Sequence, residues 1–411
     1  MKSRGAERQL AGALLALGCG ALVNAQENAA REPLPQEIVV HGFAGAADTD
    51  GGAGRRECVP HNQRSLRSCL GGGNRYVRIT SDLDIEVSSP IILDAASSDL
   101  TLDGRGHNVT LRVPPGKHHH LFALKRQFDN LIIVNVRLVG NFDGAGPIGN
   151  DIGLFEMDGD PKNNMPITRV ALINSTFKND PDGAPQPWCG NRNVTFDGIL
   201  VMDSYHPFGH GCAAPILDPD DGRARNGITT FRSVFARNGE RQPQLREGVY
   251  NYDFVRNIVY DWRDYDAREN EVGGYGLLLR DGAVDSLNIV GNAFLAGAWR
   301  EQWGCVVGTS PGPDKGADGW SPSEQALLQR DIFFARAGDP GENVGGLDCH
   351  NFAFKRSLPN PRPYVLPEVT LHDVLDNVGA HPRTPDEQAL IDEIRARLAQ
   401  PPASARSSSG R

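Results

Sequence analysis

Two arginines stand on either side of a proline, with Arg241 before Pro243 and Arg246 after it. A guanidinium group is planar and keeps its charge, so it pairs with a carboxylate through two hydrogen bonds. In an extended chain the odd spacing would point the two side chains to opposite faces, whereas a bend after Pro243 would bring both to one surface. The pair therefore indicates a site for an anionic ligand; the alternative is two ordinary solvated arginines.

The overall charge restricts what that ligand can be. The 411 residues carry a net charge of −9, and general binding to nucleic acid needs a basic surface. We therefore expect no nucleic-acid partner. An acidic polymer would have to bind a local basic patch, such as one around the two arginines.

The N-terminus has the pattern of an export signal. Basic residues precede an apolar run from Leu10 to Val23, and the small residues after it suit cleavage following Ala25. We predict a signal peptide over residues 1–25 and a secreted protein, extracellular or periplasmic; a lipid on Cys19 is the alternative. No other segment is long and apolar enough to cross a membrane, so no membrane partner is expected.

The cysteines agree with export. Without Cys19, six of the seven cysteines remain, and an even number in an exported chain suggests disulfides. Metal binding is the rival interpretation, but no two of them show the close spacing of zinc ligands. The pairing with the shortest loops joins Cys58 to Cys69, Cys189 to Cys212 and Cys305 to Cys349.

A repeat forms the elements that must position the two arginines. A β-type run rich in Val, Ile, Thr and Phe ends in Asn, Asp or Gly, and successive copies start 24 to 39 residues apart. One copy cannot bury its own apolar face, so the copies must stack. Asn135, Asn174 and Asn257 stand where each coil would bend. The copies start at Leu100, Leu131, Val170, Val194, Ile228, Tyr252 and Leu287.

This pattern favours a parallel β-helix, a single-stranded solenoid, over residues 55–383. A β-sandwich is the alternative, but sandwiches favour two-residue hairpin turns and the runs here are joined by long loops. Residues 26–54, rich in Gly, Ala, Asp and Glu, are expected to form a flexible leader. A capping box at Thr384 predicts a C-terminal helix over residues 384–400, packed on the solenoid, followed by a disordered tail at 401–411.

From Ser65 to Ile394 the sequence resembles the extracellular pectate lyases. The RQPQLR segment from Arg241 to Arg246 matches their R-x-P-x-x-R motif, and the NIVYDW segment from Asn257 to Trp262 resembles the strand that follows it. The resemblance implies an all-β, right-handed parallel β-helix with a short C-terminal helix. It also implies a polysaccharide lyase that cleaves (1→4)-linked galacturonan, or pectate, by β-elimination.

Carried over residue by residue, the resemblance makes Arg241 the base that removes the C5 proton of a galacturonate unit. Arg246 would bind the substrate carboxylate, and His206 stands where the family has a substrate-binding lysine. Cations are needed because removing a proton beside a carboxylate builds up negative charge. Since arginine is normally protonated, Arg241 can act only where neighbouring cations and desolvation favour its neutral form.

The resemblance also implies a Ca²⁺ cofactor. The family supplies two pairs of acidic ligands; Asp151 and Asp182 match one member of each pair, whereas Gly149 and Gln186 stand at the other two positions. Ca²⁺ affinity rises with the number of carboxylates. We expect Asp151, Asp182 and Gln186 to hold the ion together with substrate carboxylates, or the ion to be dispensable.

Three functions are open at this point. The first is a monomeric pectate lyase whose partner is an acidic plant polysaccharide, polygalacturonate or pectin. The second is a Ca²⁺-independent lyase for methylated pectin or another uronate polymer. The third is a catalytically inactive β-helix that binds glycans. The two arginines favour the first and second functions, and the incomplete Ca²⁺ ligand set favours the second and third.

Overall fold

A computed structural model gives the fold. The contacts within the chain separate residues 1–38 from residues 39–411, and the strands and helices below belong to the second unit. The predicted signal peptide at 1–25 and the predicted tail at 401–411 lie outside the described residues. In the part of the chain that is described, no helix is long and apolar enough to span a membrane. The structure describes residues 37–144, 152–211, 226–239, 241–246, 249–262, 276–280, 285–295, 307–310, 332–335, 343 and 358–400.

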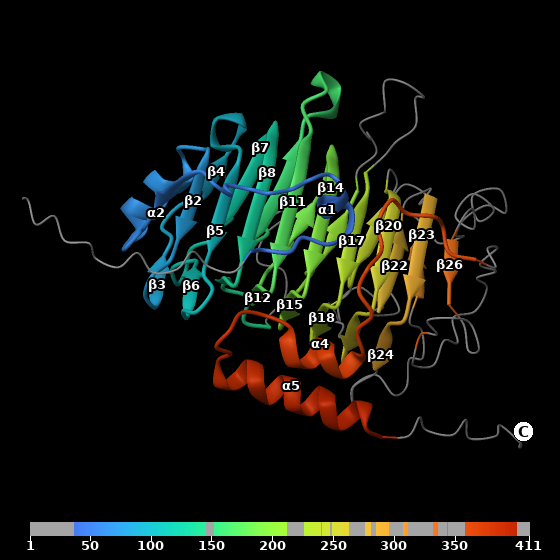
Figure 1. Ribbon diagram of the computed structural model, residues 1–411. Coiled ribbons are helices and arrows are strands. Elements are labelled where there is room, and N and C mark those ends of the chain that lie inside the picture. Colours follow the sequence, from blue (N-terminus) through green and yellow to red (C-terminus); the bar gives the residue numbers. More distant parts are fainter. Residues whose placement is uncertain are drawn as a thin grey trace, which may run out of the picture. The chain divides into compact units, whose positions relative to one another are not determined.

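The strands stack in parallel sheets, to which successive turns of the chain add one strand after another (Figure 1). The ten-stranded sheet consists of β1 Arg56–Cys58, β2 Arg75–Arg78, β5 Leu100–Asp103, β8 Phe128–Val134, β11 Ile167–Ile173, β14 Asn191–Asp197, β17 Ile228–Phe231, β20 Tyr250–Val255, β23 Asp285–Val290 and β26 Ile332–Phe334. The eight-stranded sheet consists of β3 Leu83–Glu86, β6 Val109–Arg112, β9 Arg137–Val139, β12 Thr176–Lys178, β15 Leu200–Met202, β18 Val234–Ala236, β21 Ile258–Tyr260 and β24 Ala293–Leu295.

Two four-stranded sheets complete the coils. The first consists of β4 Ile91–Leu93, β7 Phe122–Arg126, β10 Phe155–Gly159 and β13 Gln186–Pro187, and the second of β16 Gly209–His210, β19 Gln244–Arg246, β22 Leu277–Arg280 and β25 Val307–Ser310. This order of parallel strands confirms the predicted right-handed parallel β-helix. A sandwich would have required antiparallel hairpins.

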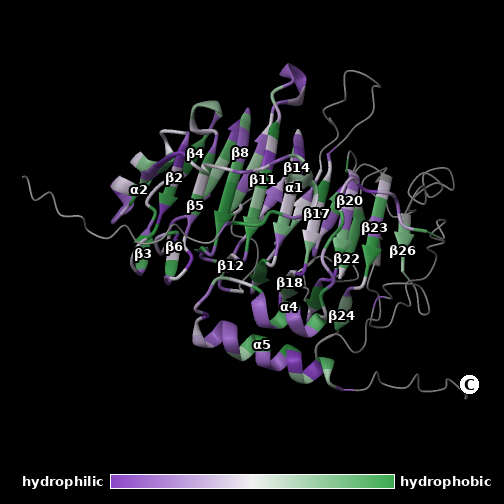
Figure 2. Cartoon of the chain, in the orientation of Figure 1, coloured by the Kyte–Doolittle hydropathy of each residue, from purple (hydrophilic) through white to green (hydrophobic). Residues whose placement is uncertain are grey.

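Apolar side chains fill the interior in columns that run from coil to coil. One column on the ten-stranded sheet passes from Leu131 through Val170 and Val194 to Ile228 and Tyr252, and all five side chains are buried. Alternate residues of a strand face the same side, so every second residue of the predicted repeat enters this core. Figure 2 shows the hydrophobic residues concentrated on the strands.

The predicted asparagine turns are present. Asn135 and Asn174 have φ of 59° and 41°, the left-handed region that asparagine tolerates better than most residues. Asn257 instead donates from its side chain to the Thr230 carbonyl at 3.0 Å, and its backbone N–H donates to Asn292 Oδ1 at 2.8 Å. These bonds satisfy polar backbone groups where one coil lies on the next.

Part of the expected flexible leader, residues 26–54, is packed on the ten-stranded sheet. The helix α1 Gly42–Ala46 lies over β14 and β17, where Phe43 N donates to Thr229 Oγ1 and Ala44 N to Thr195 Oγ1, both at 3.1 Å. Gly42 has φ of +68°, and a Cβ there would lie 2.6 Å from Thr229 Oγ1. The glycines that suggested mobility therefore allow a close approach to the sheet.

Helices cover two other parts of the stack. The helix α2 Gln63–Leu70 buries Leu66 and Leu70 against the main core. The helices α4 Leu371–Asn377 and α5 Pro385–Leu398 lie over the outer side of the eight-stranded sheet (Figure 1), where they share an apolar cluster with β15, β18, β21 and β24. The C-terminal helix predicted at residues 384–400 is thus present with its capping box. Two short 3₁₀ helices are η1 Ala95–Ser97 and η2 Pro161–Asn163.

One predicted disulfide is confirmed, between Cys58 and Cys69. Cys189 is disulfide-bonded as well. Its predicted partner Cys212 lies outside the described residues, as do Cys305 and Cys349, so those pairings stay predictions.

Candidate active site

The predicted site residues lie along the two four-stranded sheets. These sheets follow one another without a gap, because Gly211 N donates to Pro187 O at 3.2 Å across their junction. Leu245 of β19 points into the core, so its neighbours Gln244 and Arg246 belong to the outer side. We call this outer side, from β4 to β25, the site face.

Three side chains meet at the edge where the chain enters the site face. Asp182, His206 and Arg241 stand in the loops before β13, β16 and β19, so successive coils bring them together. Arg241 Nη1 donates to Asp182 Oδ1 at 3.0 Å, and His206 Nδ1 lies 3.2 Å from the same oxygen. Arg241 has φ of 77°, a backbone conformation that is uncommon for a residue with a side chain. The three side chains are between 12% and 18% exposed, so solutes can reach them.

A buried carboxylate holds this loop in place. Asp180 accepts hydrogen bonds from the backbone N–H groups of Leu154, at 2.7 Å, and Gly183, and its own carbonyl accepts one from Tyr205 N at 2.8 Å. Burial raises the pKa of the Asp180 carboxyl well above its ordinary value, although these donors act in the opposite direction. The Tyr205 ring lies 3.8 Å from the His206 ring, centroid to centroid, and fixes the imidazole beside Asp182.

Arg246 lies on the site face and stacks on an aromatic ring. Its guanidinium carbon is 5.0 Å from the centroid of Trp188, within the range of a cation–π contact. Trp188 is positioned by its backbone N–H, which donates to Met157 O at 2.8 Å. Both predicted arginines are therefore on the surface, and neither points into the core.

A carboxylate network occupies the neighbouring coils of the site face. Glu156 of β10 lies opposite Gln186 of β13 in register. Its Oε2 is 2.9 Å from His120 Nε2 and 2.6 Å from Lys125 Nζ, which also approaches Asp158 at 3.7 Å. Burial alone would raise the pKa of the Glu156 carboxyl, but the hydrogen bonds from His120 and Lys125 leave it lowered.

The described oxygen donors do not fit a Ca²⁺ site. Ca²⁺ takes six to eight oxygen ligands, whereas Asp182 already contacts an arginine and a histidine, and Glu156 contacts a lysine and a histidine. Gln186 adds one buried amide next to Gly183, and Asp151 lies outside the described residues. Among the residues whose positions are given, no group of three or more His, Cys, Asp or Glu side chains is arranged to hold a metal ion.

The sequence located part of this arrangement. It named Arg241, His206 and Asp182, which are in contact, and Arg246 and Gln186, which share the site face; their roles stay predictions. It missed Trp188 and the network around Glu156. A signal was present, since Trp188 lies two residues after Gln186 and alternation places both on one side.

Solved structures share this arrangement of coils. The major allergen from cedar pollen matches with 14% identity over 83% of this chain and 92% of its own, at a TM-score of 0.52. A mutant of Bacillus subtilis pectate lyase matches with 11% identity over 84% of this chain and 98% of its own, also at 0.52. The fold is that of the pectate lyases. A third structure, a pectate lyase studied for substrate specificity and its anti β-elimination mechanism, matches with 12% identity over 84% and 97%, at 0.50.

At these identities the likeness to the pectate lyases concerns the fold. The sequence matches no protein-family model and no curated protein. Activity and substrate must therefore be argued from the site itself.

Proposed function

We propose that this chain is a polysaccharide lyase that cleaves (1→4)-linked galacturonan, as pectate, by β-elimination. The observation that carries the proposal is the meeting of Arg241, His206 and Asp182 at the edge of the site face on which Arg246 also lies. Two arginines and a histidine, which can carry a charge when protonated, suit a polymer with a carboxylate on every sugar. The pectate lyase fold of the chain supports the same reaction class.

In the proposed reaction Arg241 takes the proton from C5 of a galacturonate unit. The electron pair of the C–H bond forms the C4–C5 double bond, the C4–O bond breaks, and the leaving oxygen takes a proton from water. Arg246 and His206 bind the carboxylate on C5 and reduce the charge that develops there.

Asp182 engages the proposed base, because Arg241 Nη1 donates to Asp182 Oδ1 at 3.0 Å. Binding of a uronate unit brings Arg246 and His206 into contact with a new carboxylate. We infer that Arg241 must leave Asp182 and lose its proton to solvent before it acts, because a guanidinium is ordinarily protonated.

The same geometry bears on calcium. Asp151, Asp182 and Gln186 were expected either to hold Ca²⁺ together with substrate carboxylates or to leave the ion dispensable, and the described donors do not fit this ion. We therefore assign neutralisation of the substrate carboxylate to Arg246 and His206. This assignment favours the Ca²⁺-independent lyase, on pectate, methylated pectin or another uronate polymer, as the second candidate.

The test is the ultraviolet absorbance of the unsaturated product. The protein is incubated with polygalacturonate and with methylated pectin, each with added Ca²⁺ and with a chelator. We expect product with the chelator present and a loss of about 10²–10⁴-fold in rate for Arg241→Ala, which removes the base. Arg395→Ala, an exposed arginine of α5, is the matched control. An Arg241→Ala variant as active as the parent would refute the mechanism.

Absence of product on every uronate polymer would instead support the third candidate, an inactive glycan-binding β-helix. The ion pair between Arg241 and Asp182 is the observation that favours it, because a paired guanidinium is a poor base.

We also infer that the protein is secreted and works as a monomer. The disulfide between Cys58 and Cys69 suits an oxidising compartment. Export is tested by sequencing the N-terminus of the protein recovered outside the cytoplasm, with Gln26 as the expected first residue.

A further inference from the structure

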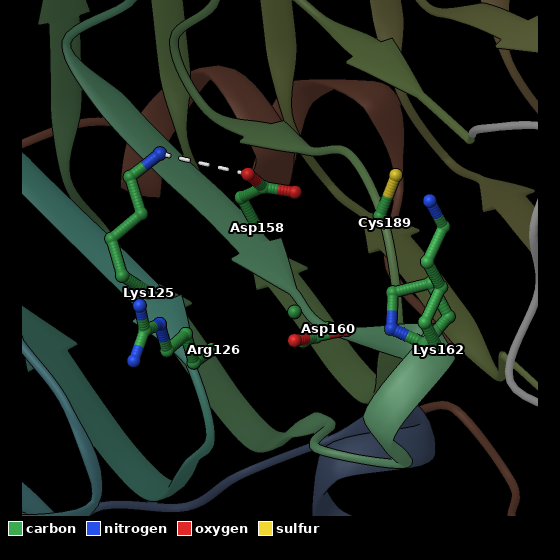
Figure 3. Close-up of a pocket in the computed structure, with 8 residues that line it drawn as sticks. Lys125, Arg126, Asp158, Asp160, Lys162 and Cys189 are labelled. Atoms are coloured by element: carbon green, nitrogen blue, oxygen red, sulfur yellow. Dashed lines mark ion pairs between the residues drawn. The ribbon is translucent and has the colours of Figure 1, made fainter.

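An open hollow lies along the edge where the chain leaves the site face. Asp182, His206 and Arg241 lie at the opposite edge, where the chain enters it. The hollow has a volume of about 620 Å³ and forms where β7 and β10 end (Figure 3). Its walls carry three cationic side chains, Lys125, Arg126 and Lys162, and two carboxylates, Asp158 and Asp160. The proposed reaction uses none of these residues.

Local backbone features shape the hollow. Arg126 has φ of 63°, and the chain turns there from β7 into β8. After β10 the Asp160 side chain accepts a hydrogen bond from Asn163 N at 3.2 Å and so caps η2, which carries Lys162. Gly159 permits the close packing below, since a Cβ there would lie 2.9 Å from the Gly190 carbonyl oxygen.

Some charged side chains of the hollow are held by neighbouring groups, and others are exposed. Lys125 is held between Glu156 and Asp158, and Asp160 is engaged in its capping bonds. Arg126 and Lys162 are exposed on the walls. An anionic group would therefore meet two cations, while sugar hydroxyls would meet the fixed Lys125 and Asp158 as donor and acceptor.

The hollow is continuous with the site face. Lys125 of β7 lies opposite Asp158 of β10 in register. The next strand, β13, ends one residue before Trp188, and the guanidinium of Arg246 stacks on the Trp188 ring. Strands in a sheet are about 4.8 Å apart, so the three steps from β10 to β19 span about 14 Å. One polymer lying along the site face would reach the hollow several sugar units away from the bond that breaks.

We propose that this hollow binds a distal uronate unit of the polymer, with its carboxylate on Arg126 and Lys162. The proposal rests on the proposed function, because it assumes that the polymer lies along the site face. It assigns the hollow a role in binding long chains and none in bond cleavage.

The test compares polymer with a short oligomer. In Arg126→Gln/Lys162→Gln we expect KM for polygalacturonate to rise about tenfold, the loss of roughly one good ion contact, with kcat unchanged. Trigalacturonate, too short to reach from Arg246 to the hollow, should be cleaved as by the parent. The control is Arg395→Gln/Arg397→Gln, which removes the same charge from α5 and should change neither value. An unchanged KM for the polymer would overturn the proposal.

A binding measurement separates this proposal from the proposed function. Calorimetric titration with a galacturonate octamer is made on Arg241→Ala protein, with and without the two hollow substitutions. A roughly tenfold loss of affinity supports the hollow even if the parent cleaves nothing, in which case only the lyase assignment fails. Equal octamer affinities in both proteins would reject the hollow whatever the activity.

Discussion

At the scale of single residues, the main feature of the site is that two of its carboxylates each contact two basic side chains. Asp182 faces both Arg241 and His206, and Glu156 faces both His120 and Lys125. Each carboxylate thus contacts two basic side chains on the site face and is only 12% (Asp182) or 16% (Glu156) exposed. Asp182 and Gln186 were named as Ca²⁺ ligands from the resemblance to the pectate lyases, but the two basic side chains around Asp182 come from other coils and no local pattern shows them.

The contact between His120 and Glu156 predicts a pH dependence of stability. Burial lowers the pKa of His120, and Lys125 acts in the same direction, but the hydrogen bond and charge of Glu156 and the hydrogen bond to the Gly153 carbonyl together leave the pKa raised. A raised pKa in the folded state means that the contact stabilises fully below the unfolded value of about 6.5 and is lost as pH rises through the folded pKa.

We therefore expect His120→Gln to lower the free energy of unfolding by about 1 kcal/mol at pH 6 and by progressively less toward pH 9. Urea unfolding of parent and variant across this range measures the difference. His107→Gln is the control, because His107 is 3.9 Å from an exposed Asp82 and should show no such trend. A difference that stays constant with pH would contradict the assignment.

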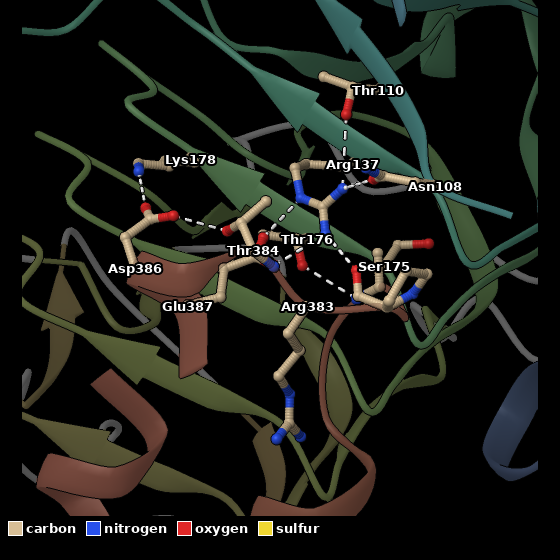
Figure 4. A network of polar contacts seen from close by, with 12 residues as sticks. Asn108, Thr110, Arg137, Ser175, Thr176, Lys178, Arg383, Thr384, Asp386 and Glu387 are labelled. Atoms are coloured by element: carbon tan, nitrogen blue, oxygen red, sulfur yellow. Dashed lines mark hydrogen bonds and ion pairs between the residues drawn. The ribbon is translucent and has the colours of Figure 1, made fainter. Parts of the chain in front are cut away.

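At the scale of elements, the C-terminal helix depends on one buried ion pair. Arg137 of β9 donates from Nε to Glu387 Oε1 at 2.7 Å and from Nη2 to Oε2 at 2.8 Å, and Glu387 also accepts from Thr384 N (Figure 4). Both charged side chains are at most 4% exposed. Nearby, Lys178 and Asp386 join the same sheet to the same helix, but at the surface.

Removing the cation of the buried pair should lower the free energy of unfolding more than removing the cation of the surface pair. Arg137→Met leaves a carboxylate buried without its cation, so we expect unfolding to become easier by about 3–5 kcal/mol. Lys178→Met should cost less than about 1 kcal/mol, since the Asp386 carboxylate can be solvated. Urea unfolding of both variants gives the comparison, and equal costs would show that the buried pair does not anchor α5. Arg137→Met/Glu387→Met should recover much of the loss.

The capping box made α5 predictable from the sequence. The packing of the leader on the ten-stranded sheet could not be predicted in this way. Thr384 and Glu387 are three residues apart and their bonds are local, so sequence spacing reveals them. The anchors of α1 are Thr195 and Thr229, more than 150 residues away in the chain from the groups that they bind. A Gly-rich segment with few apolar residues gives no sign of such partners, which is why residues 26–54 were expected to form a flexible leader.

At the scale of the whole unit, segments from both ends of the chain cross the same strands. Coils of a solenoid contact only their neighbours, so such a stack can open from its ends. Here α1 lies on β14 and β17, and Tyr364 bonds to Thr229 at 2.8 Å and packs edge-on against Phe43 at 5.0 Å. Arg362 donates to the buried Asp253 of β20 at 2.8 Å. These crossings tie three successive coils, those of β14, β17 and β20, to one another.

If the threonines that anchor these crossings are substituted, we expect the amides of both crossing segments to exchange their hydrogens faster. In Thr195→Val/Thr229→Val the Phe43 and Ala44 amides lose their acceptors, which costs about 1–3 kcal/mol each if they stay buried. We expect hydrogen exchange at residues 42–46 to accelerate at least about tenfold. Residues 360–364 should accelerate as well, because Thr229 also holds Tyr364.

Thr110→Val is the control, since Thr110 lies on the eight-stranded sheet and makes only a 3.4 Å contact with Arg137. It should leave exchange in both segments unchanged. If the double variant accelerated residues 42–46 alone, the two segments would be independent covers of the sheet. Acceleration of both would show that Thr229 holds the two segments on the middle coils, as its contacts with Phe43 and Tyr364 predict.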